Sequence, residues 1–384
     1  MRNQALKGVC IFLTGDDLMR ITDIRTGMLS APLKTPFKTA LRTATHINDI
    51  AVEICTDTGN RGYGEAPPTG VITGDTLGGI TGAITEHIAP KLIGRDIDDL
   101  EDIMNIISGC VLKNSSAKAA VDMAVYDLYG QLYNVPVYKL LGGSRKHLIT
   151  DITISVNDPD VMAEDAVKAL KRGYDTLKIK VGIDPALDVE RLMAVRQAVG
   201  KDIRIRVDAN QAWTKKQAVR ILEEMEEKSI GIEFVEQPVK AHDIEGLKYV
   251  TDNSPVEVLA DESVFSPQDA LRIMQMHAAD MVNIKLMKCG GIHEALRIAS
   301  AAEIYGMQCM IGCMLETKLS VNAAVHVACA KSIITKIDLD GPNLCSEDPV
   351  MGGAVFDEKD ITVSDLPGLG ITGLQGVSFK SVIQ

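Results

Sequence analysis

Apolar and polar positions follow two different periods from residue 151 onward. Short runs of β-branched and other apolar residues, typical of buried strands, are separated by longer stretches with helical periodicity. Eight such runs occur at intervals of about 25 residues. They cover 151–156, 176–181, 203–209, 232–238, 258–263, 281–287, 308–314 and 335–340. The pattern predicts a unit of one strand and one helix that repeats along this part of the chain.

The stretches between the runs carry the signals of amphipathic helices. After the third run, apolar residues recur at the i, i+3, i+4, i+7 spacing of one helix face. They are Ala218, Ile221, Leu222 and Met225. Thr214 and Gln217 have the spacing of a capping box at the start of this helix. Ser266-Pro267 predicts the start of another helix, and Gly200 and Gly306 stand where helices should end.

Strict alternation of strands and helices predicts a parallel sheet with helices outside it. Eight strands favour a closed (β/α)8 barrel of the TIM type over an open, doubly wound sheet. A Rossmann fold would need GxGxxG after its first strand, whereas the chain has only the GxG of Gly62-Tyr63-Gly64. We therefore expect an α/β fold built on a barrel.

The first 145 residues have a different pattern. Residues 21–64 are predicted to form two or three antiparallel strands, with a turn at 57–60. Residues 76–135 are largely helical in pattern, and 115–132 is the clearest amphipathic stretch. This region is expected to be an α+β domain in front of the barrel.

The predicted domain boundaries follow from these patterns. We expect the α+β capping domain at 19–145 and the catalytic barrel at 146–342. The tail at 343–384 contains many Gly and turn residues and is expected to complete the capping domain. Residues 1–18 match neither part and are predicted to be an unstructured extension.

Charge and composition narrow the function classes. Of 384 residues 46% are apolar, which excludes a disordered chain. The formal net charge of −12 disfavours binding to nucleic acid or to an anionic membrane, because both need a basic surface. The apolar run GVCIFL near the start is too short to span a bilayer, and two aspartates follow it, so a signal peptide is also disfavoured.

The eight cysteines are scattered without CxxC spacing. In a chain of this length they indicate buried or free thiols in a reducing compartment, and neither a disulfide framework nor a zinc site. We therefore expect a cytoplasmic protein.

Charged residues end six of the eight predicted strands, at the edge where a TIM barrel carries its active site. A single acidic residue at such a place often caps the next helix. Asp208, Glu236 and Asp261, however, end three successive strands, so their carboxylates can converge on one cation. An all-oxygen ligand set suits Mg²⁺ or Mn²⁺, and the absence of His or Cys from it disfavours zinc.

Lysines end two further strands. Lys178 and Lys180 lie two residues apart and should point to the same side of their strand, where each lowers the pKa of the other and a metal ion adds to the effect. Lys285, on the sixth strand, should face them across the barrel mouth. Two lysines on opposite sides of a metal-bound substrate are what a 1,1-proton transfer needs: one removes an α-proton and the other returns a proton to the opposite face.

The set formed by Lys178, Lys180, the three carboxylates and Lys285 resembles the enolase superfamily, in its muconate-lactonizing branch. The resemblance extends over about residues 19–384 and includes a Leu-Leu-Gly-Gly segment at 140–143. It implies a modified (β/α)7β barrel behind an N-terminal capping domain. It also implies that Lys180 and Lys285 are the acid/base catalysts, that Lys178 is an auxiliary lysine, and that the carboxylates bind Mg²⁺. The mandelate-racemase branch would place a histidine base near the seventh strand, and no histidine of this chain lies there.

The eighth strand points to a subgroup. Asp338-Leu339-Asp340 resembles the DxD of dipeptide epimerases, which binds the free α-ammonium of the substrate; the alternative is that one of the two only caps a loop. The segments at 37–45 and 64–75 further resemble the L-Ala-D/L-Glu epimerase subgroup. There the position of Arg42 contacts an acidic side chain of the substrate, unless Arg42 merely packs on the surface. Cys313-Met314-Leu315 matches a stretch whose backbone binds the substrate carboxylate, with Cys313 as a packed thiol.

The resemblance therefore implies a Mg²⁺-dependent dipeptide epimerase acting on L-Ala-D/L-Glu from murein peptides. We also expect a homo-oligomer. Two related activities stay open: an N-acylamino-acid racemase and an o-succinylbenzoate synthase-like dehydratase. Their substrates lack a free ammonium group, which would leave the DxD pair without a purpose. A barrel that only binds small acidic ligands is a further alternative, but it gives no reason for lysines on two sides of a metal.

Overall fold

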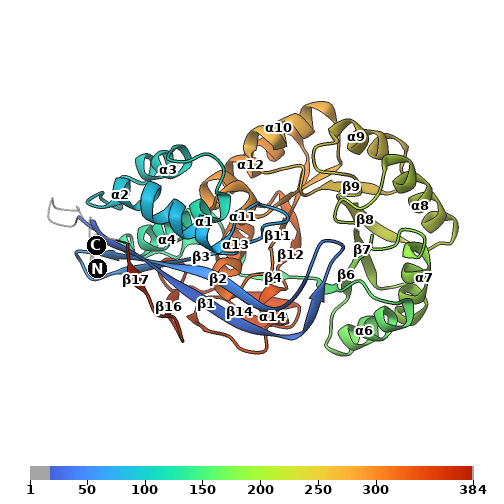
Figure 1. Cartoon of the computed structure of the whole chain (residues 1–384), viewed down its shortest axis with the longest axis horizontal. Helices are drawn as coiled ribbons and strands as arrows, with labels where there is room; N and C mark the ends of the chain where they lie inside the picture. The colour runs from blue at the N-terminus through green and yellow to red at the C-terminus, as the bar shows by residue number, and fades with distance from the viewer. Residues whose placement is uncertain (1–17, 383–384) are drawn as a thin grey trace, which may run out of the picture.

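The computed structural model describes residues 18–382. They form two lobes, an α+β lobe and a barrel lobe, which lie side by side (Figure 1). Apart from Leu18, the predicted extension at 1–18 lies outside the described residues.

All eight predicted barrel strands are present. They are β5 (Ile152–Ile154), β6 (Thr176–Lys180), β7 (Arg204–Asp208), β8 (Ile232–Glu236), β9 (Glu257–Ala260), β10 (Met281–Ile284), β11 (Gln308–Gly312) and β12 (Ile334–Asp338). Each pairs in parallel with its neighbour in sequence. Across the gap between the two end strands, the Asp151 N–H donates to the Ile337 carbonyl at 3.4 Å. The predicted TIM-like barrel is confirmed.

Helices follow the first seven strands and surround the sheet. They are α6 (Pro159–Lys171), α7 (Asp188–Val199), α8 (Lys215–Glu227), α9 (Ile244–Asn253), α10 (Pro267–Met276), α11 (Leu286–Cys289) with α12 (Ile292–Tyr305), and α13 (Lys318–Ala330). After β12 only the short α14 (Gly341–Leu344) follows, so the architecture is (β/α)7β.

The helix ends predicted from the sequence are confirmed. Thr214 and Gln217 form both hydrogen bonds of a capping box at the start of α8. The Ser266 side chain accepts from the Asp269 N–H at the start of α10. Helices α7 and α12 end at Gly200 and Gly306, both with positive φ.

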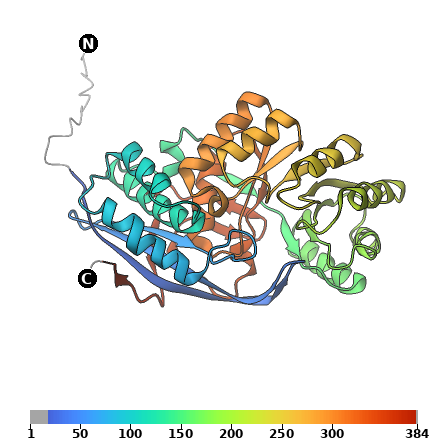
Figure 2. The ribbon, with the colours of Figure 1, turned by 45° about the horizontal axis from the view of Figure 1, so that its top comes forward.

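The α+β lobe is built on a long antiparallel sheet. Its strands are β1 (Ile21–Lys38), β2 (Thr43–Thr56) and β3 (Arg61–Ala66), and the two-residue β17 (Lys380–Ser381) pairs with β1. The helices beside it are α1 (Leu77–Gly82), the π-helix η1 (Ala83–Ile88), α2 (Ala89–Leu92), α3 (Leu100–Gly109), α4 (Ser115–Leu132) and α5 (Val137–Leu140). The β1–β2 hairpin extends along the molecule to the barrel (Figure 2), where the Lys38 N–H donates to the Ser155 hydroxyl at 3.0 Å.

Helix α4 differs from its prediction. It was expected to be amphipathic, but its side chains are buried on nearly every side. Strand β3 covers one face, because Gly62 and Gly64 have no Cβ: a Cβ there would lie about 2 Å from the carbonyls of Ala124 and Ala120. Barrel helices α11, α12 and α13 contact α4 as well. Its two acidic residues, Asp122 and Asp127, are buried as well.

The C-terminal segment connects both lobes. Strands β14 (Val355–Asp357) and β15 (Asp360–Thr362) extend from β4 (His147–Ile149), and β13 (Val350–Gly352) pairs with β16 (Ile371–Leu374). The Leu369 N–H donates to Asp127 of α4 at 2.8 Å. The boundaries proposed at 145/146 and 342/343 stay predictions. Within residues 18–382 no helix is long and apolar enough to cross a membrane, and the seven cysteines are free thiols.

Candidate active site

The charged residues singled out from the sequence lie together at the carboxyl ends of the barrel strands. Lys178 and Lys180 lie on β6, Asp208 and Glu236 end β7 and β8, and Asp261 follows β9 directly. Lys285 follows β10 and Asp338 ends β12. The side chains of these residues are buried. Parallel strands end at the same edge of the barrel, so charged residues at the ends of different strands lie close together.

Two lysine–carboxylate pairs face each other across this mouth. Lys180 Nζ lies 2.5 Å from Asp208 Oδ2, and Lys285 Nζ lies 2.8 Å from Asp261 Oδ2. The pairs belong to β6–β7 and to β9–β10, with β8 between them in the sheet order. The two lysines also line one pocket. They can therefore reach a bound molecule from two sides.

Lys178 lies between three carboxylates. Its Nζ is 2.6 Å from Glu236 Oε2, 2.7 Å from Asp338 Oδ2 and 3.2 Å from Asp208 Oδ2. Burial alone lowers the pKa of this lysine, but the carboxylates outweigh burial and hold its pKa well above the usual value.

The pKa of Lys285 is also raised, because Asp261 and Glu236 outweigh the effects of burial and of Lys178. The predicted lowering of the lysine pKa includes a bound metal ion, so it stays a prediction. Among the side chains alone, the carboxylates have the larger effect on Lys178.

The carboxylates supply a suitable donor set for a hard divalent cation. Within residues 18–382, no three Asp, Glu, His or Cys side chains already surround a point that an ion can occupy. The lysine ammonium groups described above stand between the carboxylates, so an ion and the lysines compete for the same oxygens.

Two observations nevertheless favour a cation. Glu236 Oε2 and Asp261 Oδ1 are buried and accept no hydrogen bond of good geometry, although each lies 2.6 Å from a lysine Nζ, that of Lys178 and that of Lys288. In the described part of the chain, six carboxylates here outnumber four lysines by two. They are Asp208, Glu236, Asp261, Glu262, Asp338 and Asp340, against Lys178, Lys180, Lys285 and Lys288. The residues therefore fit Mg²⁺ or Mn²⁺ in donor chemistry and in charge.

The neighbouring charges shift the pKa values of the carboxylates in opposite directions. Burial acts to raise the pKa of Asp208, but Lys180 and Lys178 lower it to about 2. Burial, and after it Asp208, raises the pKa of Glu236 to about 7. An uncompensated buried carboxylate is costly, so an added cation would stabilise Glu236 in its ionised form.

Three residues at the mouth were not found from the sequence. Glu262 follows Asp261 and is buried, and burial followed by Asp261 raises its pKa to about 8. Asn283 donates to Glu236 Oε1 at 2.8 Å. Lys288 Nζ lies 2.6 Å from Asp261 Oδ1 and donates to the Asn283 carbonyl at 2.9 Å. A search for every charged residue within four positions of a strand end would have found Glu262 and Lys288.

Asp338 and Asp340 both line the pocket. Asp338 pairs with Lys178, and Lys178 and Lys285 lower its pKa against the effect of burial. Asp340 Oδ2 accepts from the Thr153 N–H at 2.7 Å, while burial and then Asp338 raise its pKa to about 6. Asp340 also stands directly before α14, but its side chain makes no capping hydrogen bond there. Within residues 18–382, Asp338 thus has a lysine partner, whereas Asp340 forms no ion pair.

The segment Cys313–Leu315 lines the pocket directly after β11. Burial, and after it Asp340 and Glu316, holds the pKa of the Cys313 thiol well above its usual value. A thiol in this state is a poor nucleophile, which agrees with a packing role. The Met314 N–H donates to Glu316 Oε1 at 2.5 Å.

Arg42 reaches the same pocket from the α+β lobe. It lies in the turn between β1 and β2, close to Phe37 and Leu41, which also line the pocket. Burial lowers the pKa of Arg42, and within residues 18–382 it forms no ion pair. Lys38 instead points to the barrel, where its Nζ donates to Asn157 Oδ1 at 3.1 Å. A half-buried, unpaired guanidinium is available to a carboxylate of a ligand.

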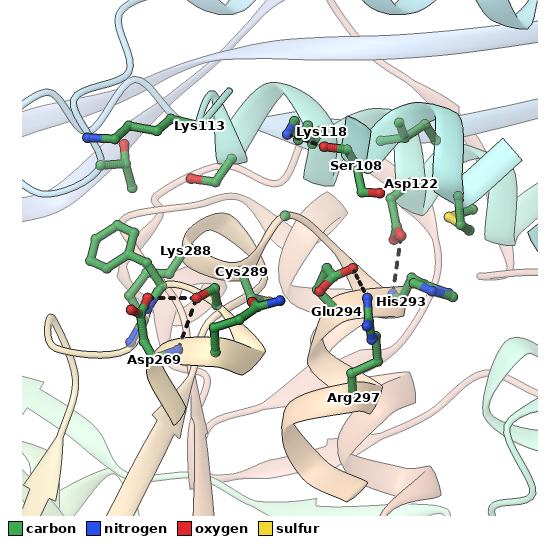
Figure 3. Close-up of a pocket in the computed structure, with 18 of the residues that line it drawn as sticks. Ser108, Lys113, Lys118, Asp122, Asp269, Lys288, Cys289, His293, Glu294 and Arg297 are labelled. Atoms are coloured by element: carbon green, nitrogen blue, oxygen red, sulfur yellow. Dashed lines mark hydrogen bonds and ion pairs between the residues drawn. The ribbon is translucent and has the colours of Figure 1, made fainter. Parts of the chain in front are cut away.

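A larger cavity, of about 670 Å³, lies away from this chemistry, between α3–α4 and α10–α12 (Figure 3). Lys113 and Lys118 lie on its α+β side, and Arg297, which pairs with Glu294 at 3.0 Å, lies on its barrel side. The two cavities have Ile72 in common. The larger cavity contains none of the predicted site residues, so size alone does not identify the active site.

Two family profiles match the chain. Residues 21–142 match the N-terminal domain of mandelate racemase / muconate lactonizing enzyme, and residues 161–375 match the family described as Enolase C-terminal domain-like. The chain belongs to the enolase superfamily. The resemblance drawn from the strand-end residues is confirmed.

Named relatives narrow the class within the superfamily. The chain is 58% identical to an L-Ala-D/L-Glu epimerase of Clostridium acetobutylicum, over 93% of this chain and 99% of that protein. A substrate-liganded structure of the Bacillus subtilis L-Ala-D/L-Glu epimerase matches with a TM-score of 0.92 and 46% identity, covering 93% and 99% of the two chains. A dipeptide epimerase of Enterococcus faecalis, in complex with Mg and L-Leu-L-Tyr, has a TM-score of 0.89 and 44% identity over 92% and 100%. This member of the enolase superfamily is an isomerase of the racemase and epimerase class.

Proposed function

We propose that this protein is a Mg²⁺-dependent dipeptide epimerase that inverts the α-carbon of the C-terminal residue, with L-Ala-D/L-Glu as its substrate. The observation that carries the proposal is the placement of Lys180 and Lys285 on two sides of one pocket, each beside a carboxylate that can bind a cation. The names of the relatives support the same activity.

Asp208, Glu236 and Asp261 would hold the ion, with the Lys178 ammonium keeping Glu236 and Asp208 in place. When bound, Mg²⁺ supplies positive charge that stabilises the substrate carboxylate as negative charge develops next to the α-carbon. Asn283 fixes the second oxygen of Glu236. The ligand set is thus oriented before the substrate arrives.

Lys180 and Lys285 perform the proton transfers. In one direction the neutral amine of one lysine takes the α-proton, and the ammonium of the other donates a proton to the opposite face, which inverts the centre. In the reverse direction their roles are exchanged. Both are buried, which keeps water from the reacting carbon.

The remaining groups of the pocket position the dipeptide. Asp338 and Asp340 would bind its free α-ammonium, and this cation would relieve the repulsion that raises the pKa of Asp340. The backbone at Cys313–Leu315 would receive the substrate carboxylate, and Arg42 would pair with an acidic side chain. An N-acylated or succinylated substrate has no ammonium group for the two aspartates, so the racemase and dehydratase alternatives fit this pocket less well.

The proposal is tested by α-proton exchange in D₂O. Libraries of L-Ala-L-X and L-X-L-Glu dipeptides, and a set of N-acetyl and N-succinyl amino acids, are incubated with the protein, and deuterium incorporation is measured by mass spectrometry. We expect exchange and epimerisation to be fastest for L-Ala-L-Glu, to stop with EDTA and to return with Mg²⁺ or Mn²⁺. Exchange that is unaffected by the chelator would contradict the metal assignment, and exchange confined to N-acylated amino acids would favour the racemase alternative.

The metal ligands are tested separately from turnover. Asp208→Asn should lose Mn²⁺ binding in electron paramagnetic resonance titrations while its far-ultraviolet circular dichroism stays that of the unchanged protein. Asp208 lies at the rim of the barrel, so its loss should leave the strands in place. Unchanged Mn²⁺ affinity in this variant would contradict the ligand set.

A further inference from the structure

Three buried carboxyl groups lie where the α+β lobe meets the barrel. They are Asp49 on β2, Glu65 on β3, and Glu316 between β11 and α13. Glu65 caps the first turn of α13 from the other lobe: it accepts from the Thr317 N–H, the Thr317 hydroxyl and the Ser320 N–H, each at 2.9 Å. These three donors hold the Glu65 carboxyl group against the N-terminus of α13.

Glu316 and Glu65 meet at a single hydroxyl group. Ser320 Oγ lies 2.9 Å from Glu65 Oε2, and it also lies within hydrogen-bond distance of Glu316 Oε2. A hydroxyl has one hydrogen to donate, so it cannot donate to both carboxylates at once. Both contacts are satisfied if Ser320 donates to Glu65 and accepts from a protonated Glu316.

Glu316 links this junction to the pocket. Its other oxygen, Oε1, accepts from the Met314 N–H at 2.5 Å. Met314 and its neighbours Cys313 and Leu315 line the pocket that contains both lysines. A chain of hydrogen bonds therefore runs from Met314 in the pocket wall through Glu316 and Ser320 to Glu65 of the other lobe, and it is complete when Glu316 is protonated.

We propose that Glu316 is a positioning residue: in its protonated form it holds the Cys313–Leu315 segment in the shape that receives the substrate carboxylate, and losing the proton weakens substrate binding. This inference rests on the proposed function, which assigns that segment to the substrate. Glu316 itself is not in contact with the reacting atoms, so its effect is on KM and not on the proton transfers.

The surrounding charges place this event near neutral pH. Burial, and after it Glu65, raises the pKa of Glu316 to about 7, while Ser320, Met314 and Lys285 act in the opposite direction. Asp49 faces the same cluster; burial and then Glu65 hold its pKa well above the usual value, and Arg42 opposes this. Below pH 7 Glu316 carries its proton. Above pH 7 two carboxylates would face each other across Ser320, and the segment should loosen.

The test compares KM for L-Ala-L-Glu between pH 6 and 9 in the unchanged protein and in Glu316→Gln. A glutamine amide still accepts from the Met314 N–H and donates to the Ser320 hydroxyl, so it mimics the protonated acid at every pH. We expect KM of the unchanged protein to rise about tenfold with a midpoint near pH 7, and KM of Glu316→Gln to lack that step. The substrate ammonium titrates equally in both experiments, so the ratio of the two KM values isolates Glu316.

Two further variants make the result specific. Glu65→Gln turns an amide toward donors and should raise KM at every pH. Asp122→Asn is the matched control: Asp122 is a buried carboxyl whose pKa burial raises to about 8, but it accepts from Ile292 and His293 beside the larger cavity (Figure 3). This control should keep the KM step.

The same step in Glu316→Gln as in the unchanged protein would overturn the inference. Failure of the unchanged protein to turn over any dipeptide would remove the proposed function and the inference with it.

A readout without substrate checks the proton itself. The pKa of Glu316 is higher in the folded than in the unfolded chain, so its stabilising effect is complete below the unfolded pKa and is lost as pH rises through about 7. The melting temperature of Glu316→Gln minus that of the unchanged protein should therefore increase as the pH rises from 5 to 8. A constant difference over this range would mean that Glu316 has no proton to lose, and would overturn the inference.

Discussion

At the scale of single residues, the site combines groups whose protonation depends on their neighbours. The lysines at the strand ends could be predicted, but the charges that surround them could not. Their identity and spacing are visible in the sequence, whereas the three carboxylates around Lys178 come from β7, β8 and β12 and meet it only in the folded barrel. A pKa follows distances of a few ångströms, which no spacing along the chain provides.

The pair Asp338 and Asp340 gives a prediction about the substrate ammonium. Asp340→Asn keeps an oxygen that can accept from the Thr153 N–H but loses the charge. We expect kcat/KM for L-Ala-L-Glu to fall about 10²-fold, because an ammonium bound in a desolvated site loses its counter-charge. N-acetyl-L-Ala-L-Glu, assayed on the same variant, has no such charge and should lose much less. Equal losses on both substrates would indicate a structural role for the pair.

Arg42 gives a prediction about the substrate side chain. In Arg42→Met, kcat/KM for L-Ala-L-Glu should fall about 10²-fold, since the proposed pair between the guanidinium and the substrate carboxylate cannot form. The kcat/KM for L-Ala-L-Leu should stay the same or rise. Lys38→Met is the control, because the Lys38 ammonium is already bound to Asn157. If Arg42→Met leaves L-Ala-L-Glu unaffected, the preference for acidic side chains is wrong and only the general dipeptide epimerase assignment survives.

At the scale of helices and strands, the sequence predicts the repeating strands and the helix caps, but not the contacts between elements that are far apart in the chain. The barrel strands follow from an apolar period that recurs, and the caps of α8 and α10 follow from local hydrogen bonds. The burial of α4 on nearly every side could not be predicted from a local pattern. It depends on Gly62 and Gly64, in a strand more than fifty residues away in the chain. The contacts of Glu65 with α13 join residues about 250 positions apart and left no local signal.

Helix α13 also carries a titratable group that supports the junction of the two lobes. His326 is fully buried, and its Nδ1 accepts from the Tyr138 N–H of α5 at 3.0 Å. Burial lowers the pKa of His326 to about 3. The unfolded chain binds a proton at this histidine below about pH 6.5 and the folded chain does not, so the free energy of unfolding should decrease as pH falls from 6.5 toward 3.

This dependence can be measured by urea unfolding between pH 4 and 7. In His326→Gln, whose side-chain oxygen can still accept from Tyr138, the slope of stability against pH should be smaller by up to about 1.4 kcal/mol per pH unit, the value for one proton. The exposed His242 offers the control, and His242→Gln should keep the slope of the unchanged protein. A His326→Gln slope equal to that of the unchanged protein would contradict a buried neutral histidine.

At the scale of the whole molecule, neither lobe forms the pocket alone. The barrel contributes the lysines and carboxylates, and the β1–β2 hairpin of the α+β lobe, which reaches the barrel (Figure 1), contributes Arg42 to the same pocket. Two relatives of this chain, one in complex with L-Leu-L-Tyr and one an L-Ala-D/L-Glu epimerase with bound substrate, share its fold, so one fold carries different dipeptide substrates. We expect substitutions in the α+β lobe to change the preference for the substrate side chain, and substitutions at the barrel lysines and carboxylates to abolish the reaction.

The central claim is that two lysines act on opposite faces of one α-carbon, and a single measurement tests it most directly. Deuterium incorporation into L-Ala-L-Glu and L-Ala-D-Glu is followed separately with the unchanged protein, Lys180→Ala and Lys285→Ala. Each variant should lose epimerisation about 10³-fold or more, and each should still exchange the α-proton of one isomer, a different isomer for each variant. A variant that interconverts both isomers at a near-normal rate, or the same isomer exchanging in both variants, would contradict the two-lysine mechanism.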